Sequence, residues 1–225
     1  SPSFSGGGSK KATETEAELD DASLTDALMI ASFSDATMTD AASTGDAVPA
    51  SLTDALPMGV YSDNTYYNGL AGFKITVDGT EWRFYNAVEV ASATGATKDD
   101  INNLWYGYKS PHEADSSYAE IAINENSGST IIVSYINPEN YNMPDYSAKE
   151  YLTMASGKYE DVHVRTVTFL GKTYECLDVP AEQTNVGRRT QFAIKEDGLI
   201  IVITFTMNDD YPLEEAVKLV SPLYY

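Results

Sequence analysis

The sequence predicts an α+β fold in which helices pack on a mainly antiparallel sheet. From about residue 60 onward, short runs alternate apolar and polar side chains, which is the pattern of half-buried strands. Tight-turn pairs such as Asp-Gly separate several of these runs, and Ser/Thr-x-x-Asp/Glu capping boxes open short helical stretches between them. Because hairpins join most neighbouring strands, we expect antiparallel pairing with helices on the sheet.

The first expected strands, residues 73–77 and 82–85, lie on either side of Asp78-Gly79. An Asp-Gly pair between two alternating runs is typical of a two-residue hairpin turn. We therefore expect these two strands to pair with each other.

Three helices are expected from their end signals. A helix over residues 86–93 should end at Gly95, because glycine readily adopts the left-handed conformation of a helix C-terminus. Capping boxes beginning at Thr97 and Ser147 open the next two. The apolar face of the third comprises Tyr151, Leu152 and Ala155, and Gly157 should end it.

A second hairpin is expected from residues 118–124 and 129–137, joined by the turn Asn126-Ser127-Gly128. Ile121 and Ile123 are expected to pair with Ile131 and Val133. The segment 124–128 also resembles the start of a calcium-binding loop, but it lacks the acidic ligand at the far end. A hairpin turn is the favoured interpretation.

The C-terminal third predicts four consecutive strands and a closing helix. Gly171-Lys172 and Asp197-Gly198 are the expected tight turns. The run from Leu199 to Phe205 is almost continuously apolar, which indicates a central strand covered on both faces. The expected strands are residues 162–170, 173–179, 188–195 and 199–207, followed by a helix over residues 212–219.

Residues 1–59 differ in composition from the rest and predict a tether. Ser, Thr, Ala, Asp and Glu dominate, so this stretch cannot bury enough apolar surface to offset chain entropy and is expected to be largely disordered. The folded domain is expected over residues 60–225. A repeated Ala-Ser-Leu-Thr-Asp-Ala-Leu predicts short helices at residues 23–32 and 51–56. The repeat has two interpretations. It is either a duplication by slippage within a low-complexity tether, or a helix that docks on the domain or on a partner.

Charge and cysteine content exclude several classes of protein. The formal net charge of −20 repels phosphate backbones and anionic membrane surfaces, so neither nucleic acid nor an anionic membrane surface is an expected partner. Because Cys176 is the single cysteine, no internal disulfide can form, and we expect it to be buried like a small hydrophobic side chain.

No apolar run is long enough to span a membrane, and no signal peptide is seen. The chain is therefore expected to be cytosolic or trimmed to a mature form.

The order of elements resembles the PsbP-like superfamily, which includes small lipoproteins of Gram-positive bacteria. Tyr66-Tyr67-Asn68, Trp82-Arg83-Phe84 and Phe169-Leu170-Gly171-Lys172 carry the resemblance, together with the last Asp-Gly hairpin. It covers residues 60–225 and implies an α/β/α sandwich. The N-terminal Ser-Gly-Gly-Gly-Ser resembles the linker of a mature surface lipoprotein, although the lipid-bearing cysteine is absent.

The resemblance implies an extracytoplasmic binding or adaptor domain, anchored at the surface of a Gram-positive bacterium through an N-terminal lipid that this chain lacks. It implies no enzyme activity and no cofactor. The expected partner is a protein or a carbohydrate at the cell surface. An accessory subunit whose tether docks a partner is the alternative, and a hydrolase is the third possibility.

No catalytic or metal-binding residue is assigned from the sequence. The two histidines, His112 and His163, occupy an expected loop and an expected solvent-facing strand position, and no Gly-x-Ser-x-Gly motif presents a nucleophile. The acidic pairs at helix starts complement the helix dipole.

The 16 tyrosines are the main functional signal, because a tyrosine ring offers contact area and its hydroxyl a hydrogen-bonding group. The alternative is that they are ordinary half-buried sheet and loop residues. The residues proposed for binding are Tyr66, Tyr67, Trp105, Tyr106, Tyr108, Tyr141 and Tyr146.

Overall fold

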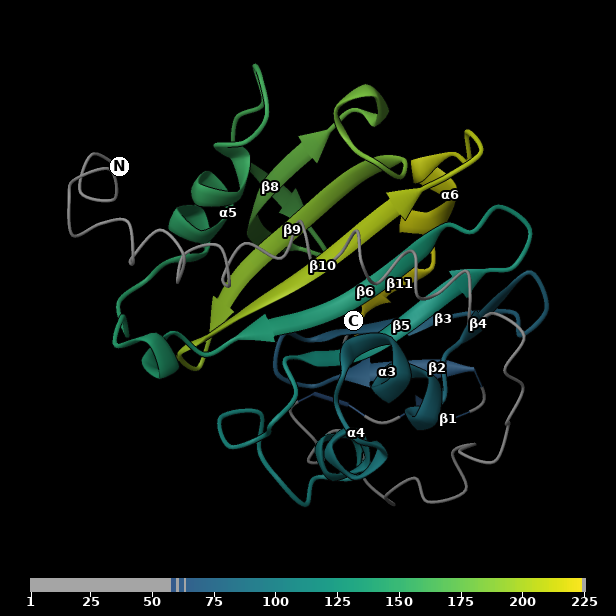
Figure 1. Cartoon of the computed structure of the whole chain (residues 1–225), viewed down its shortest axis with the longest axis vertical. Helices are drawn as coiled ribbons and strands as arrows, with labels where there is room; N and C mark the ends of the chain where they lie inside the picture. The colour runs from purple at the N-terminus through teal and green to yellow at the C-terminus, as the bar shows by residue number, and fades with distance from the viewer. Residues whose placement is uncertain (1–57, 60, 63, 224–225) are drawn as a thin grey trace.

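The computed structural model describes residues 58–59, 61–62 and 64–223, and it confirms a mixed α+β fold (Figure 1). Two antiparallel sheets make up most of it, with helices packed against the larger one. The expected helices at residues 23–32 and 51–56 lie outside the described residues. Met58 and Gly59, which the sequence assigned to the tether, are both buried.

The larger sheet has seven antiparallel strands in the order β4-β5-β6-β10-β9-β8-β7. Its middle strand, β10, is buried along its whole length and pairs with β6 on one side and β9 on the other. The central strand expected from the continuous apolar run is thus confirmed. The bounds are β4 Trp82–Phe84, β5 Tyr118–Asn124, β6 Thr130–Ile136, β7 Arg165–Phe169, β8 Lys172–Val179, β9 Arg188–Glu196 and β10 Leu199–Met207.

A smaller four-stranded sheet, in the order β1-β2-β3-β11, was largely missed by the sequence. Only β3, Phe73–Thr76, was expected as a strand. The other three are only two to four residues long, and such short strands show almost no alternation. Their bounds are β1 Tyr61–Ser62, β2 Thr65–Asn68 and β11 Val220–Pro222.

The expected hairpin between residues 73–77 and 82–85 is wrong, because β3 and β4 belong to different sheets. Asp78 accepts hydrogen bonds from the backbone N–H groups of Thr80 and Trp82, both at 3.0 Å. Gly79 donates to the Trp82 carbonyl at 2.8 Å. These local bonds turn the chain out of the small sheet and into the large one, so a tight turn forms without strand pairing.

The helices begin and end where their signals predicted, except at the C-terminus. Complete capping boxes start α3 (Ala87–Thr94), α4 (Lys98–Trp105) and α5 (Ala148–Ser156). Gly95 caps α3 in the left-handed conformation. The expected helix at residues 212–219 is shorter: α6 covers only Leu213–Val217, because the chain then joins the small sheet as β11.

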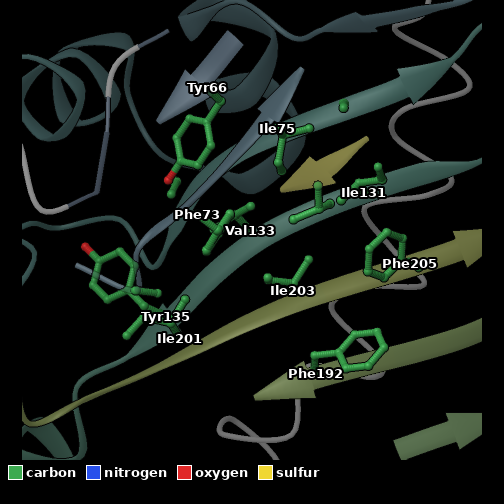
Figure 2. Packing of buried hydrophobic residues seen from close by; sticks show 14 of the residues in the cluster. Tyr66, Phe73, Ile75, Ile131, Val133, Tyr135, Phe192, Ile201, Ile203 and Phe205 are labelled. Atoms are coloured by element: carbon green, nitrogen blue, oxygen red, sulfur yellow. The ribbon is translucent and has the colours of Figure 1, made fainter. Parts of the chain in front are cut away.

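Three apolar clusters define the layers. On one face of the large sheet, α3 and α4 cover β5 and β6, and α5 covers β8 to β10. The other face carries the small sheet and α6. Figure 2 shows this second interface, in which Tyr66 and Phe73 of the small sheet face Val133 and Tyr135 of β6.

The register of the β5–β6 hairpin differs from the expected one. Ile121 pairs with Ile132, and Ile123 pairs with Thr130, so each isoleucine is shifted by one residue relative to Ile131 and Val133. An irregularity between Tyr118 and Glu120 makes Ala119 an extra residue in the ladder. The isoleucines of β5 consequently face α3 and α4.

The β7–β8 hairpin turns one residue earlier than expected. Leu170 and Gly171 both have positive φ, 56° and 74°, as the two central residues of a tight turn require, and Lys172 begins β8. β7 begins at Arg165 instead of Val162. The second expected turn, Asp197-Gly198, is confirmed, with φ of 49° and 79°.

Candidate functional site

Three of the seven aromatic residues proposed for binding lie in the core. Tyr66, Trp105 and Tyr146 are buried, at 0%, 1% and 7% exposure. The Tyr66 hydroxyl donates to the Met58 carbonyl at 2.6 Å, and the Trp105 indole N–H donates to the Ala119 carbonyl. These three side chains are structural in this conformation and present no surface to a partner.

Two more of the proposed residues, Tyr67 and Tyr141, are partly exposed but lie far from each other in the fold. Tyr67 is on β2, where its neighbour Tyr66 faces the interior, so Tyr67 points to the outer side of the small sheet. Tyr141 ends the short 3-10 helix Pro138–Tyr141 and packs beside the α5 cluster on the opposite face of the large sheet. The two do not form a common binding surface.

Tyr106 and Tyr108 are brought together at the surface. They follow the last turn of α4, and their ring centroids lie 6.5 Å apart at an interplanar angle of 60°. Tyr108 is 77% exposed and is the one strongly exposed large hydrophobic side chain in the described part of the chain. We call residues 106–117, between α4 and β5, the aromatic loop.

The aromatic loop is fixed at both ends. Trp105, just before it, is bonded to Ala119 in β5. Near its other end, the Ser116 carbonyl accepts a hydrogen bond from the Tyr135 hydroxyl of β6. Within the loop, Lys109 and Asp115 form an ion pair at 3.0 Å. A loop restrained in this way displays Tyr108 with little entropy left to lose on binding.

A glutamate that the sequence did not single out is buried beside this loop. Glu120, on β5, is 1% exposed, and it pairs across the ladder with Val133, which lies between the two sheets. Residues opposite each other in a ladder project to the same face, so Glu120 points into that interface. Its Oε1 accepts from the N–H of Ile121 at 2.8 Å, and its Oε2 has no hydrogen-bond partner among the described residues.

Other polar groups gather at the same interface. Asn68 is fully buried and donates to the Tyr66 hydroxyl at 3.1 Å, and its own oxygen accepts from Ala71. Tyr135, like Tyr66, lies in the cluster between the sheets, and both rings stand at the same end of it in Figure 2. We call Met58, Tyr66, Asn68, Glu120 and Tyr135 the buried polar cluster.

Burial controls the protonation of this cluster. Removal from water raises the pKa of Glu120 well above that of a free glutamate, despite the opposing hydrogen bond from Ile121. Burial also raises the pKa of Tyr66 and of Tyr135 above the range of a free tyrosine. All three groups therefore favour their uncharged forms. Glu120, at 1% exposure, is also closed to a substrate.

The remaining reactive side chains have ordinary structural surroundings. His112 lies in a turn with Nε2 2.7 Å from the Asp197 carbonyl oxygen, and His163 is exposed but precedes β7. Across residues 58–223, outside the gaps at 60 and 63, no group of three or more His, Cys, Asp or Glu side chains is placed to hold a metal ion. None of the helices described is long and apolar enough to cross a membrane.

Cys176 on β8 is fully buried in the largest apolar cluster, and its burial was predicted; the same burial raises the pKa of its thiol. Only the thiolate reacts with disulfide reagents, so we expect labelling by Ellman's reagent at pH 8 to be at least about tenfold slower in the native protein than in guanidinium chloride. Absorbance at the reagent's product band measures both rates. Equal rates would show that the β8 face is open to solvent.

The chain matches no protein-family model, and no curated protein matches it.

Proposed function

We propose that this protein is a non-enzymatic binding or adaptor domain of PsbP-like architecture, displayed outside the cell on a Gram-positive surface lipoprotein, and that its partner is a protein or a carbohydrate. The observation that supports a binding role is the fixed aromatic loop with its exposed Tyr108. The helices α3, α4 and α5 on one face of the large antiparallel sheet support the PsbP-like proposal. The other face carries the small sheet and only the short helix α6, which differs from the α/β/α layering that the resemblance implies.

The loop suits recognition more than chemistry. An exposed tyrosine beside a second ring supplies a rigid contact surface for an apolar side chain or for the face of a sugar. The neighbouring ion pair of Lys109 and Asp115 offers polar contacts at its rim. By contrast, the buried acid beside the loop, Glu120, has no exposed surface on which a substrate could bind.

Replacing Tyr108 tests this proposal. We expect Tyr108→Ala to weaken binding at least about tenfold, because a tyrosine anchor at an interface commonly contributes 2 kcal/mol or more. The unfolding midpoint in denaturant should stay unchanged, since this side chain is exposed. Binding is measured with biotinylated full-length protein on glycan arrays and on surface proteins extracted from Gram-positive cells.

Tyr67→Ala is the matched control, because it removes a partly exposed tyrosine from the small sheet. It should bind as well as the unmodified protein. If Tyr108→Ala retains every interaction that the unmodified protein makes, the aromatic loop is not the binding surface.

A further inference from the structure

Glu120 occupies a position where a charge is costly. It projects from β5 into the interface between the two sheets, next to the extra residue Ala119. One carboxyl oxygen is held by the N–H of Ile121, and the other has no hydrogen-bond partner in the described part of the chain. A carboxylate so enclosed would need several hydrogen bonds or a close cation to replace the water it has lost.

The charged and titratable groups around Glu120 do not supply that compensation. From β2 and β6 come the Tyr66 and Tyr135 hydroxyls, each donating to a backbone carbonyl, Met58 and Ser116 respectively.

Arg83 of β4 and Glu89 of α3 also act on Glu120, but they bond to each other. The guanidinium donates to both oxygens of the Glu89 carboxylate, at 3.0 and 2.9 Å. Glu89 raises the pKa of Glu120, and Arg83 lowers it by less, so the pair does not stabilise the ionised form.

We propose that Glu120 is a proton-dependent lock between the two sheets, which stay packed while its carboxyl is uncharged and separate more readily when it ionises. The protonated acid is compatible with the apolar interface, whereas the carboxylate draws water toward it. The lock acts on β2, because Tyr66 of β2 lies close enough to Glu120 for this carboxyl to raise the pKa of the Tyr66 hydroxyl. That hydroxyl is in turn bonded to the Met58 carbonyl. The proposal is independent of what the aromatic loop binds.

The direction in which pH changes the stability of the closed state follows from the linkage between proton binding and closing. A carboxyl with a raised pKa retains its proton in the closed protein and loses it in the opened or unfolded chain, where glutamate titrates near 4.3. The closed state therefore binds more protons, and its stability falls as pH rises from about 4.3 through the folded pKa. Within that window the equilibrium constant for closing falls by up to about tenfold per pH unit.

Hydrogen–deuterium exchange of the full chain from pH 5 to pH 9 tests the lock, using the unmodified protein and Glu120→Gln. At each pH the exchange rate of the unmodified protein is divided by that of Glu120→Gln, and this ratio cancels the intrinsic dependence of exchange on hydroxide. We expect this ratio, for peptides covering β2 and β3, to rise at least about tenfold between pH 5 and pH 8. Peptides covering α5, on the opposite face of the large sheet, should respond less.

Glu81→Gln, which removes one exposed carboxylate, is the matched control and should show exchange rates equal to those of the unmodified protein at every pH. A ratio of the unmodified rate to the Glu120→Gln rate that does not change with pH would overturn the proposal.

Infrared spectroscopy of the unmodified protein gives an independent result that does not depend on a variant. At pH 6 we expect the carbonyl stretch of a buried protonated carboxylic acid, which should disappear as the pH is raised. Its absence at pH 6 would also overturn the lock.

Discussion

Trp105→Ala is expected to lower the free energy of unfolding by about 3–5 kcal/mol, the usual cost of removing a large buried aromatic side chain. Trp105 is 1% exposed and lies in the cluster that joins α3 and α4 to β5. Its indole N–H also satisfies the Ala119 carbonyl at the irregularity in β5. The substitution leaves a cavity and a buried carbonyl without its partner. Urea unfolding followed by circular dichroism measures the loss.

Two companion variants separate the causes of this loss. Trp105→Phe keeps most of the packing and removes the N–H donor, so it should cost less than Trp105→Ala, about 1–3 kcal/mol. Tyr108→Ala, three residues further on, should change stability by less than about 0.5 kcal/mol. A stability near that of the unmodified protein for Trp105→Ala would contradict its core position and would return Trp105 to the candidate binding surface.

Gly187→Ala is expected to destabilise the domain by about 3 kcal/mol or more, through collision with backbone and not through strain in its own dihedral angles. A Cβ atom at this position would lie 1.8 Å from the carbonyl oxygen of Met207 and 2.6 Å from the side chain of Asn208. Gly187 immediately precedes β9, and Met207 ends β10, its neighbour in the sheet. The two strands would have to separate at this end. Thermal unfolding and the soluble yield of the variant report the effect.

Gly157→Ala is the appropriate comparison. This glycine caps α5 in an ordinary right-handed conformation, and a Cβ there would meet only the Met154 carbonyl, at 3.3 Å. We expect a change of less than about 1 kcal/mol in either direction. If the two alanine variants unfold at the same temperature, the close approach of Gly187 to β10 is incorrect.

The sequence predicted helix starts and the central strand well, because each depends on interactions or patterns within a few neighbouring residues. Thr97 and Ser147 each form the reciprocal bonds of the predicted capping box, because a short polar side chain can reach a helix N–H only three residues away. Asn86 forms the same bonds at the start of α3, although it was not recognised as a cap. The continuous apolar run of β10 could be recognised as central because both of its faces are covered by other layers.

Pairing between distant segments could not be predicted in this way. Asp78-Gly79 makes a turn whether or not the strands beside it pair, so the sequence did not reveal that β3 and β4 join separate sheets. The short strands β1, β2 and β11 have no periodic pattern of their own. They form because β3 lies between β2 and β11, which come from opposite ends of the domain.

Glu120 was not recognised from the sequence because the small sheet that covers it was not predicted. In β5, Ile121 and Ile123 indicate the face toward α3 and α4, so alternation assigns Glu120 to the opposite face, which would be exposed if nothing covered it. The small sheet does cover it. Tyr66 was misjudged for the same reason, because a residue of an unrecognised strand cannot be assigned an inner face from its neighbours alone.

The central position of β10 determines when the domain can form during synthesis. The strands β4 to β6 and β7 to β9 are two three-stranded units, and only residues 199–207 join them. β11 then completes the small sheet with residues 220–222. Neither sheet can be completed until residues 199–222 have been made, so the nascent polypeptide keeps the apolar strands β4 to β9 uncovered until β10 and β11 follow them.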